Sequence, residues 1–319
     1  MFVPTTFAAA LIMTILSTIC WGSFANTFKV TKNYRFELYY WDYAAGIFLI
    51  SLVLAFTMGS MRGGDTSFIA NLHSAAPLNL AFAAIGGFIF NIANVLLIAA
   101  IEIVGLAIAF PISIGIALVE GVVLSYALQP KGSAGLLAAG VIMAVLAVIM
   151  IGLAYGQLQG PNRTVSRKGV IVCVISGLLM GTFAPFVTRA MTANRPLTPY
   201  TVAVFFTLGA VICCFFFNTY LMKRPLVGEA VGFSGYAAAP ASYHVLGLLG
   251  GVVWGVGTVF NFVAASLVGV AISYAIGQAS PMIAALWGVF VWREFRGSNR
   301  QARLYLVGMF VSYLLALVL

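Results

Sequence analysis

The chain is a succession of long apolar runs separated by short polar stretches. These runs lack the strict alternation of apolar and polar positions that marks a half-buried strand. A bilayer core about 30 Å thick requires roughly 20 apolar residues in a helical span. The pattern therefore predicts ten spans, at about residues 6–28, 39–60, 76–101, 104–128, 134–156, 168–191, 198–222, 242–266, 269–292 and 303–319.

The fold class follows from the lack of water in the hydrocarbon layer, because every backbone amide there needs a hydrogen-bond partner within the protein. Apolar runs of this length meet that need as helices rather than as barrel strands. Of the 319 residues, 62% are hydrophobic and 7% are charged, so no soluble domain is left over. The sequence predicts an all-α, multi-pass integral membrane protein in a lipid bilayer.

The first apolar run is counted as a span rather than as a signal peptide. It lacks a basic start and an A-x-A-like cleavage site, and it continues into "CWGSFANTFK". The four cysteines form no C-x-x-C pair and lie inside predicted spans, so we expect neither a disulfide framework nor a zinc site. They are Cys20, Cys173, Cys213 and Cys214.

The net charge of +9 would favour a nucleic-acid partner in a soluble protein, but here the basic residues sort by loop. With each loop numbered by the span before it, twelve lie near odd loops and four near even loops. The positive-inside rule then predicts cytoplasmic odd loops, outward-facing termini and no nucleic-acid partner. We expect a bacterial inner (plasma) membrane; the oligomeric state stays open. The twelve are Lys29, Lys32, Arg35, Arg163, Arg167, Lys168, Lys223, Arg224, Arg293, Arg296, Arg300 and Arg303, and the four are Arg62, Lys131, Arg189 and Arg195.

An internal repeat divides the chain. The stretch "GGVVWGVGTVFNFVAASLVGVAISY" at residues 250–274 aligns without a gap on "GGFIFNIANVLLIAAIEIVGLAIAF" at 86–110, so that Gly250 matches Gly86. Paired glycines and a shared "VG-x-A-I" corner coincide. A second match, "SxxxxGSFA" on "SxxxxGTFA", relates Ser17 to Ser176 in nearly the same register. Repeats of this kind indicate two similar structural units.

We therefore predict two five-helix halves, residues 1–160 and 161–319. Because five is odd, the second half enters the membrane from the opposite side, which gives inverted repeats about an axis in the membrane plane. Such halves can rock about a midplane site that opens to each face in turn, the alternating-access mechanism. Gly86, Gly87, Gly251, Gly255 and Gly257 would allow tight helix packing or a hinge.

Several motifs resemble the drug/metabolite transporter superfamily, namely "CWGSF", "GGVVWGVG", "VGVAISY" and "SPMIAALWGVFVWRE". The glycine-rich motifs are more similar to its glucose/ribose porter and rhamnose symporter branch, and "YYWDY" resembles the related ureide permeases. The resemblance implies ten helices, inverted repeats and movement of small polar metabolites, with proton coupling in some relatives. Ala117 and Pro130 stand where a second proline and glutamate, matching Pro281 and Glu294, would complete the pattern.

Ionisable groups inside a membrane are costly and thus functional candidates. Glu120 lies beyond the middle of the fourth predicted span without a basic neighbour in sequence, and we predict it to be a proton-coupling group. The alternative is a permanently protonated glutamic acid bonded to a neighbouring helix. Glu102 is a second coupling candidate, with simple solvation near the membrane surface as its alternative.

Polar side chains on facing spans are the candidate substrate site. Asn91 and Asn94 share one side of the third span with Glu102, and the eighth span carries an equivalent stripe. Amide side chains beside a stacked aromatic ring suit a sugar or a ureide; interhelical bonding that serves only assembly is the alternative. The predicted substrate-binding residues are Asn91, Asn94, Trp254, Thr258, Asn261, Tyr274, Gln278, Trp21 and Asn26.

An enzyme is not expected, because no nucleophile with a base, H-E-x-x-H motif or phosphate loop is present and His73 and His244 stand alone in sequence. We predict a secondary active transporter, with sugar uptake as the first reading. Permeation of a ureide, nucleobase or nucleoside-type heterocycle is the alternative, followed by drug or amino-acid export. No resident cofactor is expected; a proton or other ion gradient would supply the energy.

Overall fold

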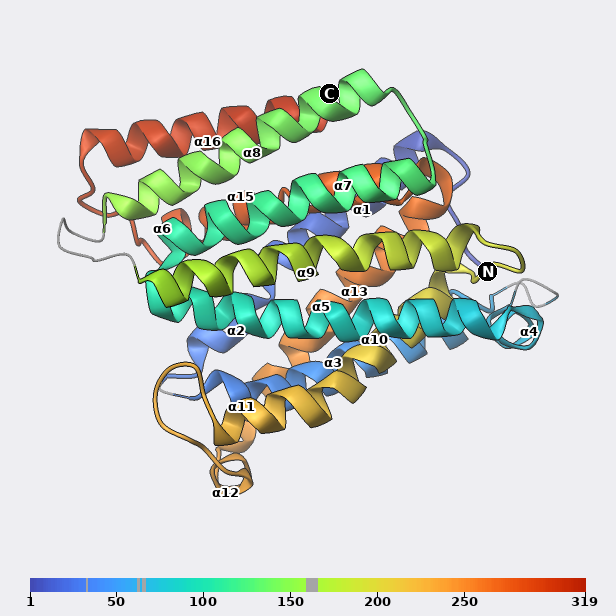
Figure 1. Ribbon diagram of the computed structural model, residues 1–319, viewed down its shortest axis with the longest axis horizontal. Helices are drawn as coiled ribbons and strands as arrows, with labels where there is room; N and C mark the ends of the chain where they lie inside the picture. The colour runs from blue at the N-terminus through green and yellow to red at the C-terminus, as the bar shows by residue number, and fades with distance from the viewer. Residues whose placement is uncertain (33, 62–63, 65–66, 159–165) are drawn as a thin grey trace.

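The computed structural model describes residues 1–32, 34–61, 64, 67–158 and 166–319. Ten helical segments in it are long and apolar enough to cross a membrane, as predicted. All regular elements of the described residues are helices (Figure 1). Arg62, Arg163 and the predicted boundary between residues 160 and 161 lie outside the described residues.

Six spans are single helices and four are built from two or three consecutive helical pieces. The single helices are α3 (Phe36–Phe56), α5 (Pro77–Val104), α8 (Ala134–Gly156), α9 (Arg167–Thr192), α13 (Ala241–Val268) and α16 (Arg300–Val318). The first composite span is α1 (Phe7–Ser23) followed by α2 (Ala25–Val30), and the fourth is α6 (Leu106–Ala109), a π-helical turn (Phe110–Ile114) and α7 (Gly115–Leu128). The seventh is α10 (Pro199–Cys213), a π-helical turn (Cys214–Asn218) and α11 (Thr219–Lys223). The ninth is α14 (Val270–Gly277), α15 (Ser280–Leu286) and a π-helical turn (Trp287–Val291).

Hydroxyl and amide side chains mark where several helices begin. Thr6, Ser133 and Thr198 each accept a hydrogen bond from the backbone N–H three residues further on, at the starts of α1, α8 and α10. Asn299 does the same for α16 at 2.8 Å. These caps satisfy N–H groups that the first turn of a helix leaves free, which fixes each helix start near the membrane surface.

Two glycine corners join consecutive spans without a loop. Helix α5 ends at Val104 and α6 begins at Leu106, with Gly105 between them at φ 78° and ψ 164°. Helices α13 and α14 meet in the same way at Gly269, at φ 91° and ψ 154°. Residues with a Cβ rarely adopt these angles. The shared "VG-x-A-I" motif therefore encodes one sharp corner twice, once in each predicted half.

Close helix crossings also recur with the repeat. Helices α5 and α10 cross where Gly87 and Gly209 each face a main-chain carbonyl of the other helix, leaving no room for a Cβ. Helices α3 and α13 cross in the same manner at Gly46 and Gly251. In the sequence alignment of the two halves that matches Gly87 with Gly251, Gly209 matches residue 45, the neighbour of Gly46. The glycines thus permit backbone contact at corresponding places in the two halves.

The repeat-related helices α5 and α13 run in opposite directions. The Lys131 ammonium, which follows α7, donates to the carbonyl of Leu267 at the end of α13 (3.2 Å). Helices α7 and α13 therefore end at the same face. Since α5 ends at the corner where the α6–α7 span begins, α5 ends at the other face. These directions and crossings are consistent with inverted repeats, and the two-half division stays a prediction.

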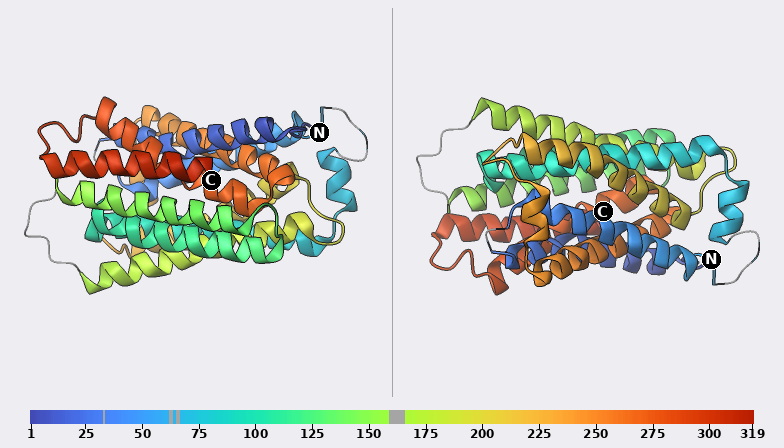
Figure 2. Two further views of the ribbon diagram at one scale, coloured as in Figure 1. Left: turned by 90° about the horizontal axis from the view of Figure 1, so that it is seen from above. Right: turned by 90° about the horizontal axis from the view of Figure 1, so that it is seen from below.

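Outside the crossings, α8 and α16 pack against each other at one edge of the bundle (Figures 1 and 2). Two short helices were not predicted: α4 (Phe68–Ser74) and α12 (Phe233–Ala237), both in loops. The ninth span, predicted as one run, is interrupted between α14 and α15 just before Pro281. Pro281, the second residue of α15, has no backbone N–H to donate to the carbonyl of Gly277 four residues earlier, which accounts for the interruption at Gln278 and Ala279.

Candidate functional site

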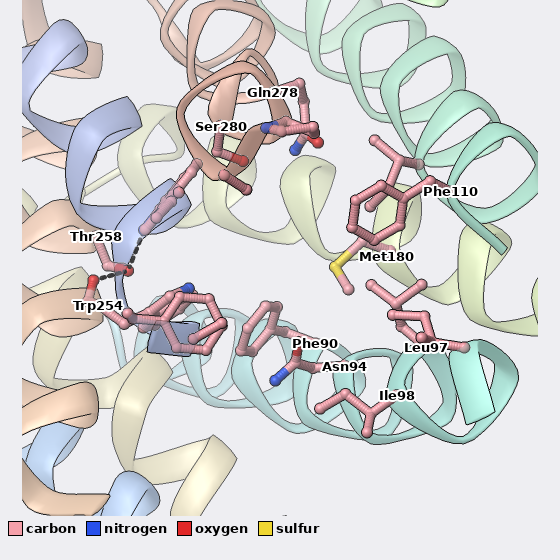
Figure 3. Close-up of a pocket in the computed structure, with 18 of the residues that line it drawn as sticks. Phe90, Asn94, Leu97, Ile98, Phe110, Met180, Trp254, Thr258, Gln278 and Ser280 are labelled. Carbon is pink, nitrogen blue, oxygen red and sulfur yellow. Dashed lines mark hydrogen bonds between the residues drawn. The ribbon is translucent and has the colours of Figure 1, made fainter. Parts of the chain in front are cut away.

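A cavity of about 390 Å³ lies between the two predicted halves. Both contribute to its wall, with α1, α3 and α5 on one side of the division and α9, α10, α13 and α15 on the other. Figure 3 shows side chains from these helices converging on the space. Aromatic rings form much of the lining: Trp21, Phe24, Phe28, Phe36, Tyr39, Phe90, Phe110, Phe183, Phe206, Trp254 and Phe262.

The cavity extends toward the face that carries the odd loops, called here the odd-loop face. Phe28 and Phe36, on either side of the first loop, line it together with the exposed Glu102 near the end of α5. Toward the opposite, even-loop face it ends at packed rings, with Phe206 5.4 Å from Phe183 and 5.5 Å from Phe262 between centroids. The cavity is thus accessible from one face and closed at the other.

A row of stacked rings forms one wall. The Trp254 indole lies 4.8 Å from the Phe90 ring at an interplanar angle of 25°, and 5.9 Å from the Trp21 indole at 19°. Phe90 and Trp254 occupy matching positions in the repeat. The row therefore joins the two predicted halves and offers flat apolar surface to a ligand.

Thr258 holds this row in place. Its hydroxyl accepts from the Trp21 indole N–H (3.1 Å) and donates to the carbonyl of Trp254 (3.1 Å). The Trp21 N–H is therefore already paired and does not serve as a ligand donor. Both residues line the cavity, so Thr258 fixes the orientation of the aromatic wall.

Few polar groups in the cavity are available to a ligand. Asn94 donates through Nδ2 to the Tyr40 hydroxyl (3.2 Å), whereas its Oδ1 makes no hydrogen bond within the described residues. The side chains of Gln278 and Ser280 also make none with any residue that the structure describes, and they lie on the opposite wall (Figure 3). The Asn94 carbonyl oxygen, the Gln278 amide and the Ser280 hydroxyl thus remain free to orient a bound molecule.

The other predicted substrate residues lie outside the cavity lining. Asn91 accepts from the Tyr40 hydroxyl (2.7 Å), and Asn261 donates to the carbonyl of Ser273 across the Gly269 corner (2.9 Å). The Tyr274 hydroxyl lies 3.2 Å from the carbonyl of Ala117. These side chains hold helices together in this conformation, and their role in binding stays a prediction.

The two predicted coupling carboxyls lie in different surroundings. Glu102 is at the cavity entrance, whereas Glu120 does not line the cavity and faces α9. The Thr182 hydroxyl donates to Glu120 Oε1 (2.9 Å), and Oε2 is buried against Gly181 without a hydrogen-bond partner among the described residues. Glu120 therefore does not contact the cavity in this conformation, and its role in coupling stays a prediction.

Polar contacts at the odd-loop face connect the first and ninth spans. Lys29 forms an ion pair with Glu294, and the Tyr155 hydroxyl donates to Glu294 Oε2 (2.9 Å). Beside it, the Trp292 indole N–H donates to Asn26 Oδ1 (2.6 Å), which places the predicted site residue Asn26 in this helix contact. These pairings join residues that are far apart in the sequence and were not anticipated.

A second polar group at this face includes a histidine that stands alone in sequence. His244 Nδ1 lies 2.8 Å from Asp42 Oδ2, and the Tyr236 hydroxyl donates to Asp42 Oδ1 (2.6 Å). Burial, with the neighbouring Asp42 carboxylate, raises the pKa of Tyr236, so its hydroxyl remains a donor. The group attaches α12 to α3 and α13, outside the cavity.

Known proteins resemble the chain along most of its length. Ureide permease 1 of Arabidopsis thaliana is 20% identical over 340 residues, covering 87% of this chain and 86% of its own. The probable glucose uptake protein GlcU of Priestia megaterium is 23% identical over 285 residues, covering 84% of this chain and 87% of its own. These relatives are permeases and uptake proteins, which at the family level are transporters rather than enzymes.

The fold is also found in a solved crystal structure. It superposes with a TM-score of 0.65 at 14% sequence identity, covering 97% of this chain and 96% of the other. At that identity the likeness concerns the fold alone. The family described as "Sugar transport protein" matches residues 12–319, which include all ten spans apart from the first few residues of the first. The chain therefore belongs to the sugar transport protein family.

Proposed function

We propose that this chain is a secondary active transporter that carries a small polar metabolite across the membrane by alternating access, with sugar uptake as the first candidate. The observation that supports this most strongly is the aromatic cavity between the two predicted halves, which reaches the odd-loop face and ends at packed rings toward the other. A site between inverted halves can be presented to each face in turn.

The aromatic wall supports sugar as substrate. A pyranose ring presents a face of C–H groups that packs on a flat indole such as Trp254, while its hydroxyls need partners at the edge. Asn94, Gln278 and Ser280 supply such partners on both sides of the space. Glucose uptake is also what the GlcU relative is named for.

The scarcity of free polar groups supports the second candidate, a planar heterocycle such as a ureide. A hydroxyl buried without a hydrogen bond costs about 1–3 kcal/mol, so a sugar would depend on bridging water in this cavity. A cyclic urea has two flat faces, and its ring N–H and C=O groups lie in one plane at the edge, where the amides of Asn94 and Gln278 can pair with them. The ureide permeases among the relatives agree with this candidate.

The two candidates are separated by measuring Tm of the purified protein with a panel of sugars, allantoin and purines. A ligand at about 100 times its Kd adds roughly 2.7 kcal/mol to folded-state stability, which raises Tm measurably. We expect at least one sugar to raise it. If only heterocycles raise Tm, the sugar assignment is rejected and the second candidate replaces it.

We further propose Glu120 as the coupling group, acting through α9. Its unpaired Oε2 against Gly181 would accept a proton and could then donate a hydrogen bond. A change in charge at this contact would alter how tightly α7 and α9 pack, since an unpaired charge in a membrane interior is costly. Proton loading would thereby be linked to the relative position of the two halves.

Replacing Glu120 with Gln should remove proton-driven accumulation and leave exchange of substrate partly intact. One proton and an imposed step of one pH unit provide about 1.4 kcal/mol, enough for about tenfold accumulation. The variant should fall to a ratio of about 1 in proteoliposomes under that gradient. Glu229→Gln, in an exposed loop, is the control and should behave as the unmodified protein. Unchanged accumulation in Glu120→Gln would reject the assignment.

A further inference from the structure

The even-loop face is closed in part by Tyr274 at the beginning of the ninth span. Its ring meets Phe183 edge to face at 5.6 Å between centroids. Its hydroxyl lies 3.2 Å from the carbonyl of Ala117 and 3.3 Å from that of Met180, so it bridges toward both α7 and α9. Tyr274 is buried. One side chain thus ties the ninth span to the fourth and the sixth.

Gly121 makes this contact possible. A Cβ at that position would lie 2.5 Å from Cε1 and 2.9 Å from Cζ of the Tyr274 ring, well inside contact distance. Any larger residue at 121 would therefore push the tyrosine away from α7. The closed contact at the even-loop face depends on a tyrosine hydroxyl and on a missing methyl group.

The repeat relates this contact to a second one at the odd-loop face. The register that aligns 86–110 with 250–274, continued along the chain, matches Phe110 with Tyr274 and Ala285 with Gly121. The register that aligns Ser17 with Ser176 matches Phe24 with Phe183. Phe24 and Phe110 both line the cavity, but unlike their counterparts they form no aromatic pair with each other. The Phe183–Tyr274 pair is thus in contact at the even-loop face, whereas the matching pair, Phe24 and Phe110, is apart at the odd-loop face.

We propose that Phe183–Tyr274 and Phe24–Phe110 are the two gates of the transport path, one closing as the other opens. The proposal depends on the alternating access proposed above and assigns its moving contacts to named side chains. When Phe24 and Phe110 meet, Phe110 approaches Ala285 and closes the odd-loop face. Tyr274 then leaves Gly121 and opens the even-loop face.

The two gates are unequal, which sets the resting state. The gate at the even-loop face has a hydroxyl that donates to a carbonyl, and Gly121 lets the ring close fully. The gate at the odd-loop face has Phe110, which lacks the hydroxyl, and Ala285, which carries a methyl group. Closing the latter gains less, so the conformation open to the odd-loop face is favoured in the absence of substrate.

Exchanging the hydroxyl between the gates tests this. The variants are Tyr274→Phe and Phe110→Tyr. Both are made in a background that lacks the four native cysteines and carries one reporter cysteine, Leu97→Cys, at a position that lines the cavity. The native cysteines are Cys20, Cys173, Cys213 and Cys214. A membrane-impermeant maleimide is added to right-side-out and to inverted membrane vesicles without substrate. Ser234→Cys in the odd loop that holds α12 identifies which vesicles expose the odd-loop face.

The measured quantity is the rate of labelling from the odd-loop face divided by the rate from the even-loop face. One hydrogen bond shifts a two-state equilibrium by roughly twofold to tenfold. Tyr274→Phe should lower the ratio by that factor. Phe110→Tyr should also lower it, because its hydroxyl stabilises closure of the odd-loop face. The double exchange should lower it furthest.

A steric variant provides an independent test. Gly121→Ala should lower the labelling ratio by about tenfold, because the added methyl group displaces Tyr274. Gly115→Ala on the same helix is its control: a Cβ there meets nothing within 4 Å, and the ratio should not change. The Tm of each variant verifies that it is folded, and the hydroxyl exchanges alter no backbone should Gly121→Ala fail to fold.

A ratio unchanged in Tyr274→Phe and Phe110→Tyr, or raised in either, would overturn the gate assignment. Because labelling is measured without substrate, this result is independent of which substrate is carried. If no ligand raises Tm while the ratios shift as stated, the substrate assignment fails and the gates stand. If a ligand raises Tm while the ratios do not shift, the gates fail and the substrate assignment stands.

Discussion

Trp254→Ala should weaken substrate binding by about a hundredfold. Trp254 is the middle ring of the wall formed with Trp21 and Phe90, so its removal takes away flat contact area and the support of both neighbours. Truncating a buried aromatic anchor at a binding site typically costs about 2 kcal/mol or more. A cost of about 2.8 kcal/mol corresponds to a hundredfold change in Kd. Titration of the ligand found by the Tm panel measures the change.

Trp41→Ala is the matched control for this variant. Trp41 packs against Phe215 and Phe233 and donates to the Met222 sulfur, away from the cavity. It should lose stability and retain its Kd. Trp254→Phe, which keeps a ring, should stay within about tenfold of the original affinity. If Trp41→Ala and Trp254→Ala weaken binding equally, the aromatic wall is not the substrate site.

Gly87→Ala should destabilise the folded protein by about 3 kcal/mol, which lowers Tm by roughly 5–10 °C. Its added Cβ would overlap the main-chain carbonyl of Phe206, and backbone cannot move aside as a flexible side chain does. Helices α5 and α10 would have to separate along their crossing. Loss of close contact matters in lipid, where the hydrophobic effect contributes little to helix association.

Gly135→Ala serves as the comparison, since a Cβ there meets only the Ser133 hydroxyl at 3.9 Å. It should leave Tm unchanged or raise it slightly, as alanine favours helix over glycine by about 1 kcal/mol. Thermal unfolding of the detergent-solubilised variants gives both values. A Tm for Gly87→Ala within about 2 °C of that of the unmodified protein would disprove the tight crossing, because a shift of that size corresponds to a loss of only about 1 kcal/mol in the free energy of unfolding.

The spans and corners could be predicted because their causes are local. A run of apolar residues needs only the bilayer to become a helix, so all ten spans were found, with ends within a few residues. The corners at Gly105 and Gly269 follow from glycine's backbone freedom and from their repetition. The inverted direction of α5 and α13 follows in the same way, from an odd number of crossings.

Which polar residues line the cavity was harder to predict, because that depends on which neighbouring helix packs against each side chain. Asn91 and Asn94 are three residues apart and share one side of α5, yet only Asn94 lines the space. Tyr40 on α3 occupies the position between them and bonds to both. Helical spacing identifies a polar side of a helix; it does not reveal which polar group a neighbouring helix will cover.

Long-range polar pairs could not be predicted, for the same reason. Asp42 and His244 belong to different predicted halves, as do Lys29 and Glu294. Nothing within either stretch of sequence indicates a partner in the other half of the chain. The apolar loop-free corners constrain the chain locally, whereas these pairs form only once the whole bundle has assembled.

The glycine corners have a consequence for protein engineering. At residues 105 and 269 one helix ends and the next begins with a single amino acid between them, so there is no slack to accommodate an inserted tag or reporter domain. The connection that carries α12 is long and largely exposed. Epitopes or fluorescent fusions belong in that connection, where added length does not pull on the helices that enclose the cavity.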